Sequence, residues 1–158
     1  MGWYDCHLHS FHIRHPISGM QVDIGLPFED DDMFGMEKKV DWEMKIADWF
    51  TPKNPRANYI YDFGDSWDHS VVLEKIVPRE VGISYPACID GKRACPPEDC
   101  GGIGGYYELL HILADPKHRE HKELKKWFGR AFDSEYFDPL EVGFGNPGKR
   151  LKNVQEDH

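Results

Sequence analysis

Two short stretches of the chain hold most of the side chains that could do chemistry. The first runs from Tyr61 to His69, Tyr-Asp-Phe-Gly-Asp-Ser-Trp-Asp-His, and it holds three carboxylates and one imidazole within eight residues. Carboxylates near a histidine can bind a divalent metal ion or share a proton. Asp65 also suits a simple turn, because its side chain can accept hydrogen bonds from nearby backbone N–H groups. His69 alternates with apolar residues on a face that we expect to be buried, which favours a hydrogen-bonded structural histidine over a ligand or catalytic group.

The second stretch is a thiol-rich loop from Cys88 to Cys100, Cys-Ile-Asp-Gly-Lys-Arg-Ala-Cys-Pro-Pro-Glu-Asp-Cys. Its three cysteines could complete a tetrahedral zinc site with a histidine from elsewhere in the chain. The spacing argues against a standard zinc module, because six residues separate the first two thiols, four separate the last two, and no Cys-x-x-Cys pair is present. The candidate zinc ligands are His7, His9, His69, Cys88, Cys95 and Cys100.

The last thiol of this loop also suggests a nucleophile. Cys100 precedes the glycine-rich run 101–105 and a predicted helix, and a helix N-terminus stabilises a thiolate. The negative charges of the adjacent Glu98 and Asp99 oppose that effect, which disfavours a cysteine nucleophile. The glycine run lacks the Gly-Lys-Ser/Thr ending of a phosphate-binding loop, so a rigid loop is the favoured interpretation.

The two stretches can form one site only if the fold brings them into a shared cleft. For such a site we select Asp65, His69 and Glu98 as the candidate catalytic residues. The other residues expected there are Tyr61, Asp62, Gly64, Trp67, Asp99 and Tyr106. Apart from zinc, no cofactor is predicted.

Alternating apolar and polar residues predict a sheet in the first half of the chain. Strands are expected over 6–13 and 20–24. A further short strand is expected over 43–46, followed by one helical turn through Trp49.

The strongest β pattern is a hairpin. The aromatic and β-branched segments 59–63 and 67–77 are separated by Gly64-Asp65-Ser66, a typical hairpin loop. Alternate residues on each arm share one face, which we expect to be the core face: Tyr59, Tyr61 and Phe63 on the first arm, and Trp67, His69 and Val71 on the second.

Helices are expected in the second half. An apolar stripe at helical spacing begins at Tyr106, and Asp115-Pro116 predicts the start of a second helix that ends at Gly129. Asp138-Pro139 is a further helix-start pattern. The expected buried face of the second helix consists of Leu124, Trp127 and Phe128.

The order of the elements, strands first and helices second, predicts an α+β fold. We expect an antiparallel sheet with helices from the second half packed on one face. Residues 1–145 are expected to form a single domain, and residues 146–158 a polar C-terminal tail.

Composition and charge limit the function further. With 158 residues, 40% of them hydrophobic, the chain suits a folded domain rather than a disordered one. Its net charge of −9 makes nucleic acid and anionic membranes unfavourable partners. The acidic run 29–32 and the basic segment 117–130 are interpreted as solvated faces. No stretch approaches the roughly 18 apolar residues of a membrane span and no signal peptide is recognisable, so a cytoplasmic protein with thiols rather than disulfides is expected.

Several blocks together resemble the plasmid pRiA4b ORF-3-like proteins. They are Met1-Gly2-Trp3 with His7-Leu8-His9, Tyr61-Asp62-Phe63-Gly64-Asp65 with Trp67 and His69, Cys95-Pro96-Pro97-Glu98-Asp99-Cys100-Gly101-Gly102 with Gly105-Tyr106, and Phe137-Asp138. The resemblance covers almost the whole chain and implies an α+β fold without an assigned activity. Some members are associated with mobile elements. Members usually carry a strand and a helix ahead of the first block, so the resemblance implies either that the true start lies upstream or that this chain is a shortened version. A missing strand would expose a sheet edge or a core face.

Three functions are compatible with the sequence. We favour a binding or interaction module for an unidentified protein or small-molecule partner, with its site built from the Tyr61–His69 hairpin and the Cys95–Gly102 loop. The first alternative is a metal-dependent hydrolytic enzyme that uses zinc or another divalent ion, with Glu98 or Asp65 as base. The second is a nucleic-acid accessory protein that uses the basic segment 117–130. The sequence does not decide whether the protein is an enzyme.

Overall fold

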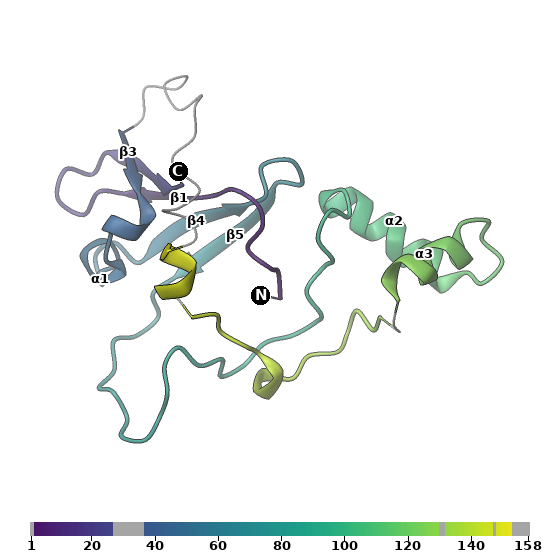
Figure 1. The fold of residues 1–158 in the computed structure, drawn as a ribbon. Helices are drawn as coiled ribbons and strands as arrows, with labels where there is room; N and C mark the ends of the chain where they lie inside the picture. Colours follow the sequence, from purple (N-terminus) through teal and green to yellow (C-terminus); the bar gives the residue numbers. More distant parts are fainter. Residues whose placement is uncertain (1, 27–36, 130–131, 147, 153–158) are drawn as a thin grey trace. The chain divides into compact units, whose positions relative to one another are not determined.

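A computed structural model of the chain describes residues 2–26, 37–129, 132–146 and 148–152. Its internal contacts divide the chain into two compact units. The first, here called the sheet unit, is the continuous segment Asp5–Glu80. The second, the loop-and-helix unit, joins Met1–Tyr4 to Val81–His158. Figure 1 shows the elements of both units.

The sheet unit is built on one five-stranded sheet with the strand order β3-β2-β1-β4-β5. The strands are β1 His9–Arg14, β2 Gln21–Gly25, β3 Glu37–Val40, β4 Arg56–Tyr61 and β5 Trp67–Val72. All neighbouring strands are antiparallel except β2 and β3, which are parallel. The predicted α+β fold, with strands before helices, is confirmed, and its sheet is mixed but mostly antiparallel.

The register places apolar side chains from four strands on one face of the sheet. Phe11 lies between Ile24 on β2 and Tyr59 on β4, and Tyr59 lies opposite His69 on β5. Because successive strand residues point to opposite faces, the alternation in the sequence becomes one continuous apolar surface. The predicted hairpin is confirmed, although its first arm ends at Tyr61 and its second at Val72. Phe63, which was expected on the core face, lies in the turn and is 49% exposed. The core consists of Ile13, Val22, Ile24, Trp49 and Ala57.

The segment after β3 covers part of this apolar face. It contains a 3-10 turn, η2 Asp41–Glu43, and a single helical turn, α1 Ile46–Trp49. Trp49 is buried in the core, and Met44 and Phe50 pack against it. The predicted helical turn through Trp49 is confirmed. The strand predicted over 43–46 is wrong, because the strand of the sheet comes earlier, at β3.

The loop-and-helix unit contains two helices that pack against each other, α2 Gly102–Ala114 and α3 His121–Phe128 (Figure 1). The second helix starts later than predicted, because Asp115 forms a turn in which its Oδ1 accepts the N–H of Lys117 at 2.9 Å. Gly129 ends α3 in the left-handed conformation, with φ of 65°, as predicted.

The rest of this unit is mostly loop. Asp138 caps the short 3-10 turn η3 Pro139–Glu141, because its Oδ1 accepts the N–H of Leu140 at 2.9 Å. Residues 148–152 are helical. None of the described helices is long and apolar enough to cross a membrane. The acidic run 29–32 lies outside the described residues. The domain boundaries and the packing of the second-half helices on the sheet stay predictions.

Candidate functional site

Asp62 organises the hairpin turn. Asp62 is buried and has a positive φ of 55°. Its Oδ1 accepts the backbone N–H groups of Gly64 at 2.9 Å and of Asp65 at 3.3 Å, and its own N–H donates to the carbonyl of Leu8 at 2.9 Å. The Nε2 atom of His7 lies 3.8 Å from Asp62 Oδ2. These contacts give the carboxylate of Asp62 a structural role in the turn.

His9 and His69 both have hydrogen-bonding partners within the sheet unit. His9 is buried, and its Nε2 lies 2.9 Å from Oδ2 of Asp41, which connects β1 to η2. His69 Nδ1 lies 3.1 Å from the carbonyl oxygen of Tyr59 on the neighbouring strand. The favoured interpretation of His69 as a hydrogen-bonded structural residue is consistent with this contact.

The cysteines of the predicted zinc set belong to the other unit. None of the four cysteines, all of which the structure describes, forms a disulfide. Cys88 donates from Sγ to the carbonyl oxygen of Asp90 at 3.4 Å. Because the predicted set takes its histidines from one unit and its thiols from the other, the zinc site and the shared cleft both stay predictions.

The glycine-rich run turns the loop into α2. Gly101 and Gly102 have positive φ values of 84° and 65°, a conformation that favours glycine. A side chain at Gly105 would overlap the carbonyl oxygen of Cys100, and the N–H of Gly105 donates to the carbonyl of Gly101 at 3.1 Å. Backbone geometry therefore accounts for these glycines, in agreement with the rigid-loop interpretation.

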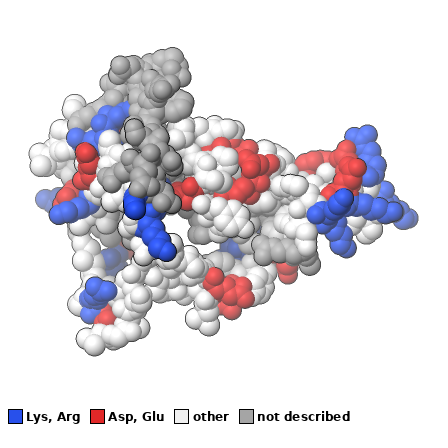
Figure 2. Space-filling view, viewed as in Figure 1, with Lys and Arg blue, Asp and Glu red and all other residues white. Residues whose placement is uncertain are grey.

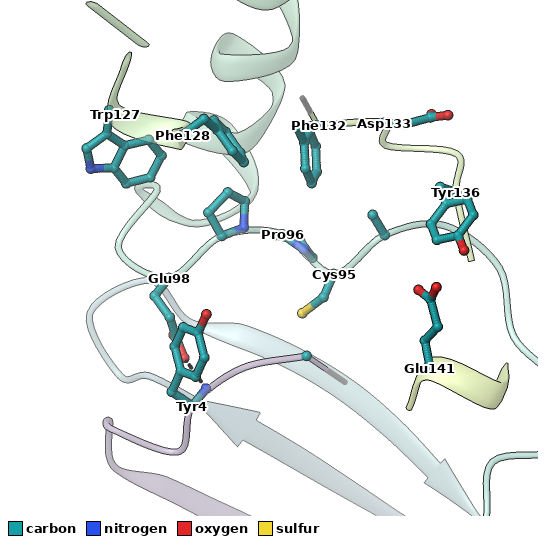
Figure 3. Close-up of a pocket in the computed structure, with 13 residues that line it drawn as sticks. Tyr4, Cys95, Pro96, Glu98, Trp127, Phe128, Phe132, Asp133, Tyr136 and Glu141 are labelled. Atoms are coloured by element: carbon teal, nitrogen blue, oxygen red, sulfur yellow. Dashed lines mark hydrogen bonds between the residues drawn. The ribbon is translucent and has the colours of Figure 1, made fainter. Parts of the chain in front are cut away.

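A pocket of about 620 Å³ lies within the loop-and-helix unit (Figure 3). Its volume falls in the range of about 300–1,000 Å³ that is usual for ligand sites. Four segments form its walls: the first residues of the chain, the loop 94–98, the end of α3, and the segment 132–141. The lining residues are Gly2, Tyr4, Ala94, Cys95, Pro96, Pro97, Glu98, Trp127, Phe128, Phe132, Asp133, Tyr136 and Glu141.

Two hydrogen bonds fix the start of the chain against the loop. Trp3 donates from Nε1 to the carbonyl oxygen of Pro96 at 2.9 Å. The backbone N–H of Tyr4 donates to Glu98 Oε1 at 2.7 Å, which is the dashed line in Figure 3. The Glu98 carboxylate is thereby held at the pocket wall, next to the ring of Tyr4.

Tyr136 and Glu141 form the opposite end of the pocket. In Figure 3 the carboxylate of Glu141 points toward the phenol of Tyr136 and into the pocket, whereas that of Asp133 points away. Hydrogen bonding to the Glu141 carboxylate raises the pKa of Tyr136. The phenol is therefore neutral at physiological pH, and the charge of this end of the pocket is that of the carboxylates.

Cys95 is the thiol in the pocket wall. Burial has the largest effect and raises the pKa of Cys95. The backbone N–H of Gly2 and the positive charge of the amino terminus lower it, the charge of Glu98 raises it, and the backbone N–H of Trp3 lowers it by less. A neutral thiol is a weak nucleophile, because the thiolate is the reactive form. We therefore assign Cys95 to the lining of the pocket and not to nucleophilic chemistry.

This assignment predicts how the thiols react. At neutral pH we expect iodoacetamide to modify the exposed Cys6 first and Cys95 last, since the raised pKa of Cys95 reduces its thiolate fraction. Mass spectrometry of peptides from a time course measures the order, with a Cys6→Ser variant as control for the fast phase. If Cys95 reacts as fast as Cys6, the thiol is activated and the assignment is wrong.

Trp127 corrects a prediction about α3. The sequence places it on the buried face of that helix with Leu124 and Phe128, but Trp127 is 55% exposed and lines the pocket. Figure 2 shows Lys and Arg atoms mixed with Asp and Glu around α2 and α3. Arg119 is paired with Glu120 at 3.0 Å. This mixture of charges agrees with the interpretation of 117–130 as a solvated face.

Among the sequence-predicted site residues, Cys95 and Glu98 line the pocket, whereas Asp99 and Tyr106 of the same unit do not. The candidates of the Tyr61–His69 hairpin belong to the sheet unit. Sequence reasoning missed the contributions of α3 and of the segment 132–141. The one pattern that could have indicated them is the spacing of four residues between the aromatic residues Phe128, Phe132 and Tyr136.

Comparisons with known proteins identify a family but no activity. The family model described as plasmid pRiA4b ORF-3-like protein matches residues 1–141. The uncharacterized protein y4hQ of Sinorhizobium fredii is 36% identical over 155 residues, which are 98% of this chain and 73% of that protein. The crystal structure of the protein of unknown function MM3350 from Methanosarcina mazei Go1 is 44% identical, with a TM-score of 0.81, over 91% of this chain and 77% of that one.

Proposed function

The chain belongs to the plasmid pRiA4b ORF-3-like family, and we propose that it is a binding module whose pocket holds a cationic group with an apolar stem, such as an arginine side chain of a partner protein. One observation carries the proposal. Of the thirteen residues that line the pocket, five are aromatic, three are carboxylates and none is Lys, Arg or His.

Such a lining matches the two parts of an arginine or lysine side chain. The faces of aromatic rings carry negative potential and attract cations, by about 0.5–2 kcal/mol for each well-placed ring. The carboxylates of Glu98 and Glu141 add negative charge at opposite ends of the pocket. The apolar stem of the ligand side chain would pack against Pro96 and Pro97, since long cationic side chains bury their methylene groups against apolar surface.

The exposure of the rings favours a protein as the source of the cation. Tyr4 is 84% exposed, Trp127 55% and Tyr136 51%. Large exposed aromatic side chains around a hollow are typical of surfaces that become buried when a partner binds. The metal-dependent hydrolase and the nucleic-acid accessory protein stay predictions from the sequence.

A short acetylated peptide with one central arginine tests the proposal. The same peptide with neutral citrulline in place of the arginine is the control. We expect the arginine peptide to bind with a change in tryptophan fluorescence from Trp127, and the citrulline peptide to bind at least about fivefold more weakly. Binding of the arginine peptide should also weaken with added salt, because part of the attraction is between charges at the surface.

Variants identify the pocket as the binding site. Glu141→Gln and Glu98→Gln should each weaken binding about fivefold, because each removes one negative charge and keeps the size of the side chain. Glu108→Gln is the matched control, since Glu108 is exposed on α2 and does not line the pocket. Equal binding of the two peptides, or an equal loss in Glu108→Gln, contradicts the proposal.

A further inference from the structure

The face of the sheet opposite the apolar core carries two rows of side chains across the strands, and all of them except Val72 are polar. The rows follow from the register, in which His12 pairs with Asn58 and Ile13 with Ala57. Continuing this register by one residue sets Arg14 opposite Arg56, and both arginines line the same hollow. The first row is Asp23, His12, Asn58 and Ser70, and the second is Gln21, Arg14, Arg56 and Val72.

The two arginines make an unfavourable pair. Like charges directly opposite each other on neighbouring strands destabilise a sheet. Arg14 and Arg56 are both exposed, and neither has an ion-pair partner among the residues that the structure describes. Two neighbouring arginines with no ion-pair partner in the described part of the chain indicate a position where an external anion would compensate the repulsion.

The pair lines an open hollow of about 350 Å³. The other polar side chains in its lining include His12, Gln21, Asn58 and Ser70. No carboxylate is among the described residues that line it, although the whole chain has a net charge of −9. The neighbouring Asp23 is buried and lies 2.8 Å from Nδ1 of His12.

The backbone that carries Arg14 is held in place before any ligand arrives. Asn54 donates from Nδ2 to the carbonyl oxygen of Arg14 at 2.8 Å and to that of Trp49 at 2.9 Å. These bonds connect the end of β1 to the end of α1. The backbone at Arg14 is therefore already ordered in the free protein, and this reduces the conformational entropy that is lost on binding.

We propose that this hollow binds the phosphate group of a small phosphorylated molecule. A single guanidinium satisfies a carboxylate through two parallel hydrogen bonds, whereas two guanidinium groups match the higher charge and the three free oxygens of a phosphate monoester. The hollow is larger than a phosphate, and Asn58, Gln21 and Ser70 offer partners for hydroxyl groups of the attached part. This proposal is independent of the cation pocket, because the two sites lie in different units.

Calorimetric titration of the full chain tests it with inorganic phosphate, ribose 5-phosphate, ribose and acetate as probes. We expect saturable binding of phosphate, tighter binding of ribose 5-phosphate, and at least about tenfold weaker binding of ribose and acetate. Arg14→Gln and Arg56→Gln should each weaken phosphate binding about tenfold. The phosphate affinity of Arg14→Lys should lie between those of the wild type and Arg14→Gln, because lysine keeps the positive charge but lacks the paired N–H donors of the guanidinium group. Lys75→Gln, which removes one exposed charge elsewhere in the sheet unit, should leave affinity unchanged.

Thermal unfolding gives a second measurement, which distinguishes a binding role of the two arginines from a stabilising one. Because each Gln variant removes one member of a repulsive pair, its melting temperature without phosphate should equal or exceed that of the wild type. No saturable phosphate binding, equal affinity for acetate, or unchanged affinity in both Gln variants overturns the proposal. Tighter binding of a dinucleotide, which carries only a phosphodiester, than of ribose 5-phosphate also overturns it.

Discussion

Replacing Asp62 by alanine should lower the free energy of unfolding by about 3 kcal/mol, a large loss for a single polar side chain. The carboxylate accepts two backbone N–H groups of the hairpin turn, and alanine would leave both without that acceptor. Asp62 also has a φ of 55°, a conformation that alanine adopts less readily than aspartate or asparagine. Urea denaturation followed by circular dichroism measures the loss.

Two further variants separate the causes. Asp62→Asn keeps an acceptor oxygen and tolerates positive φ, so it should lose only about 1 kcal/mol. Asp68→Ala removes an exposed carboxylate from the second strand of the same hairpin and should change stability by less than about 0.5 kcal/mol. The turn does not depend on Asp62 if its alanine variant is as stable as Asp68→Ala.

Gly105→Ala should lower the free energy of unfolding by at least about 2 kcal/mol. Its new methyl group would overlap the carbonyl oxygen of Cys100, so the first turn of α2 must move away from the loop. The position of the loop wall formed by Glu98 should then shift, and binding of the arginine peptide should weaken together with stability. Denaturation and peptide titration of the same variant measure both effects.

The neighbouring glycine supplies a matched control. A methyl group at Gly104 meets no atom within 4 Å. Because alanine is favoured over glycine inside a helix, Gly104→Ala should raise stability by up to about 1 kcal/mol. If Gly104→Ala and Gly105→Ala behave alike, the close approach of Gly105 to the loop has no energetic importance.

The core face of the sheet could be predicted because period-two alternation is a local property. Tyr59, Tyr61, Trp67 and His69 share the face that the sequence assigned to them. Strand β3 could not be predicted in this way, because Glu-Lys-Lys-Val has no apolar alternation. Its pairing with β2 is a tertiary property, and lysines are common on edge strands, where they oppose further pairing.

The role of Asp62 in the turn could not be predicted for a similar reason. Asp62 lies two residues before Gly64 and Asp65 directly follows it, and the aspartate side chain gives either residue the same ability to accept backbone N–H groups. The structure shows that Asp62, which has a positive φ, accepts the N–H groups of the turn, and a single residue's backbone angle cannot be predicted from its type.

The pocket shows where sequence patterns are ambiguous. With Leu124, the residues Trp127 and Phe128 have the spacing of a buried helix face. A helix that lines a pocket shows the same spacing, so the pattern does not distinguish the two. Cys95 and Glu98 were predicted because they lie in a dense motif. Tyr136 and Glu141 were not, since Tyr136 lies on a loop and Glu141 at the end of the short 3-10 turn η3, and neither belongs to a longer periodic pattern.

The division of the chain into one continuous and one interrupted unit sets an order for its synthesis. All the strand pairings of the sheet unit lie within Asp5–Glu80. Every strand of the sheet is therefore available for pairing once Glu80 has left the ribosome. The other unit must wait for a contact such as that of Trp3 with Pro96, which joins residues 93 positions apart. Closing so long a loop is slow. The sheet of the nascent protein should therefore be folded before the first residues of the chain make their contact with the loop at Pro96.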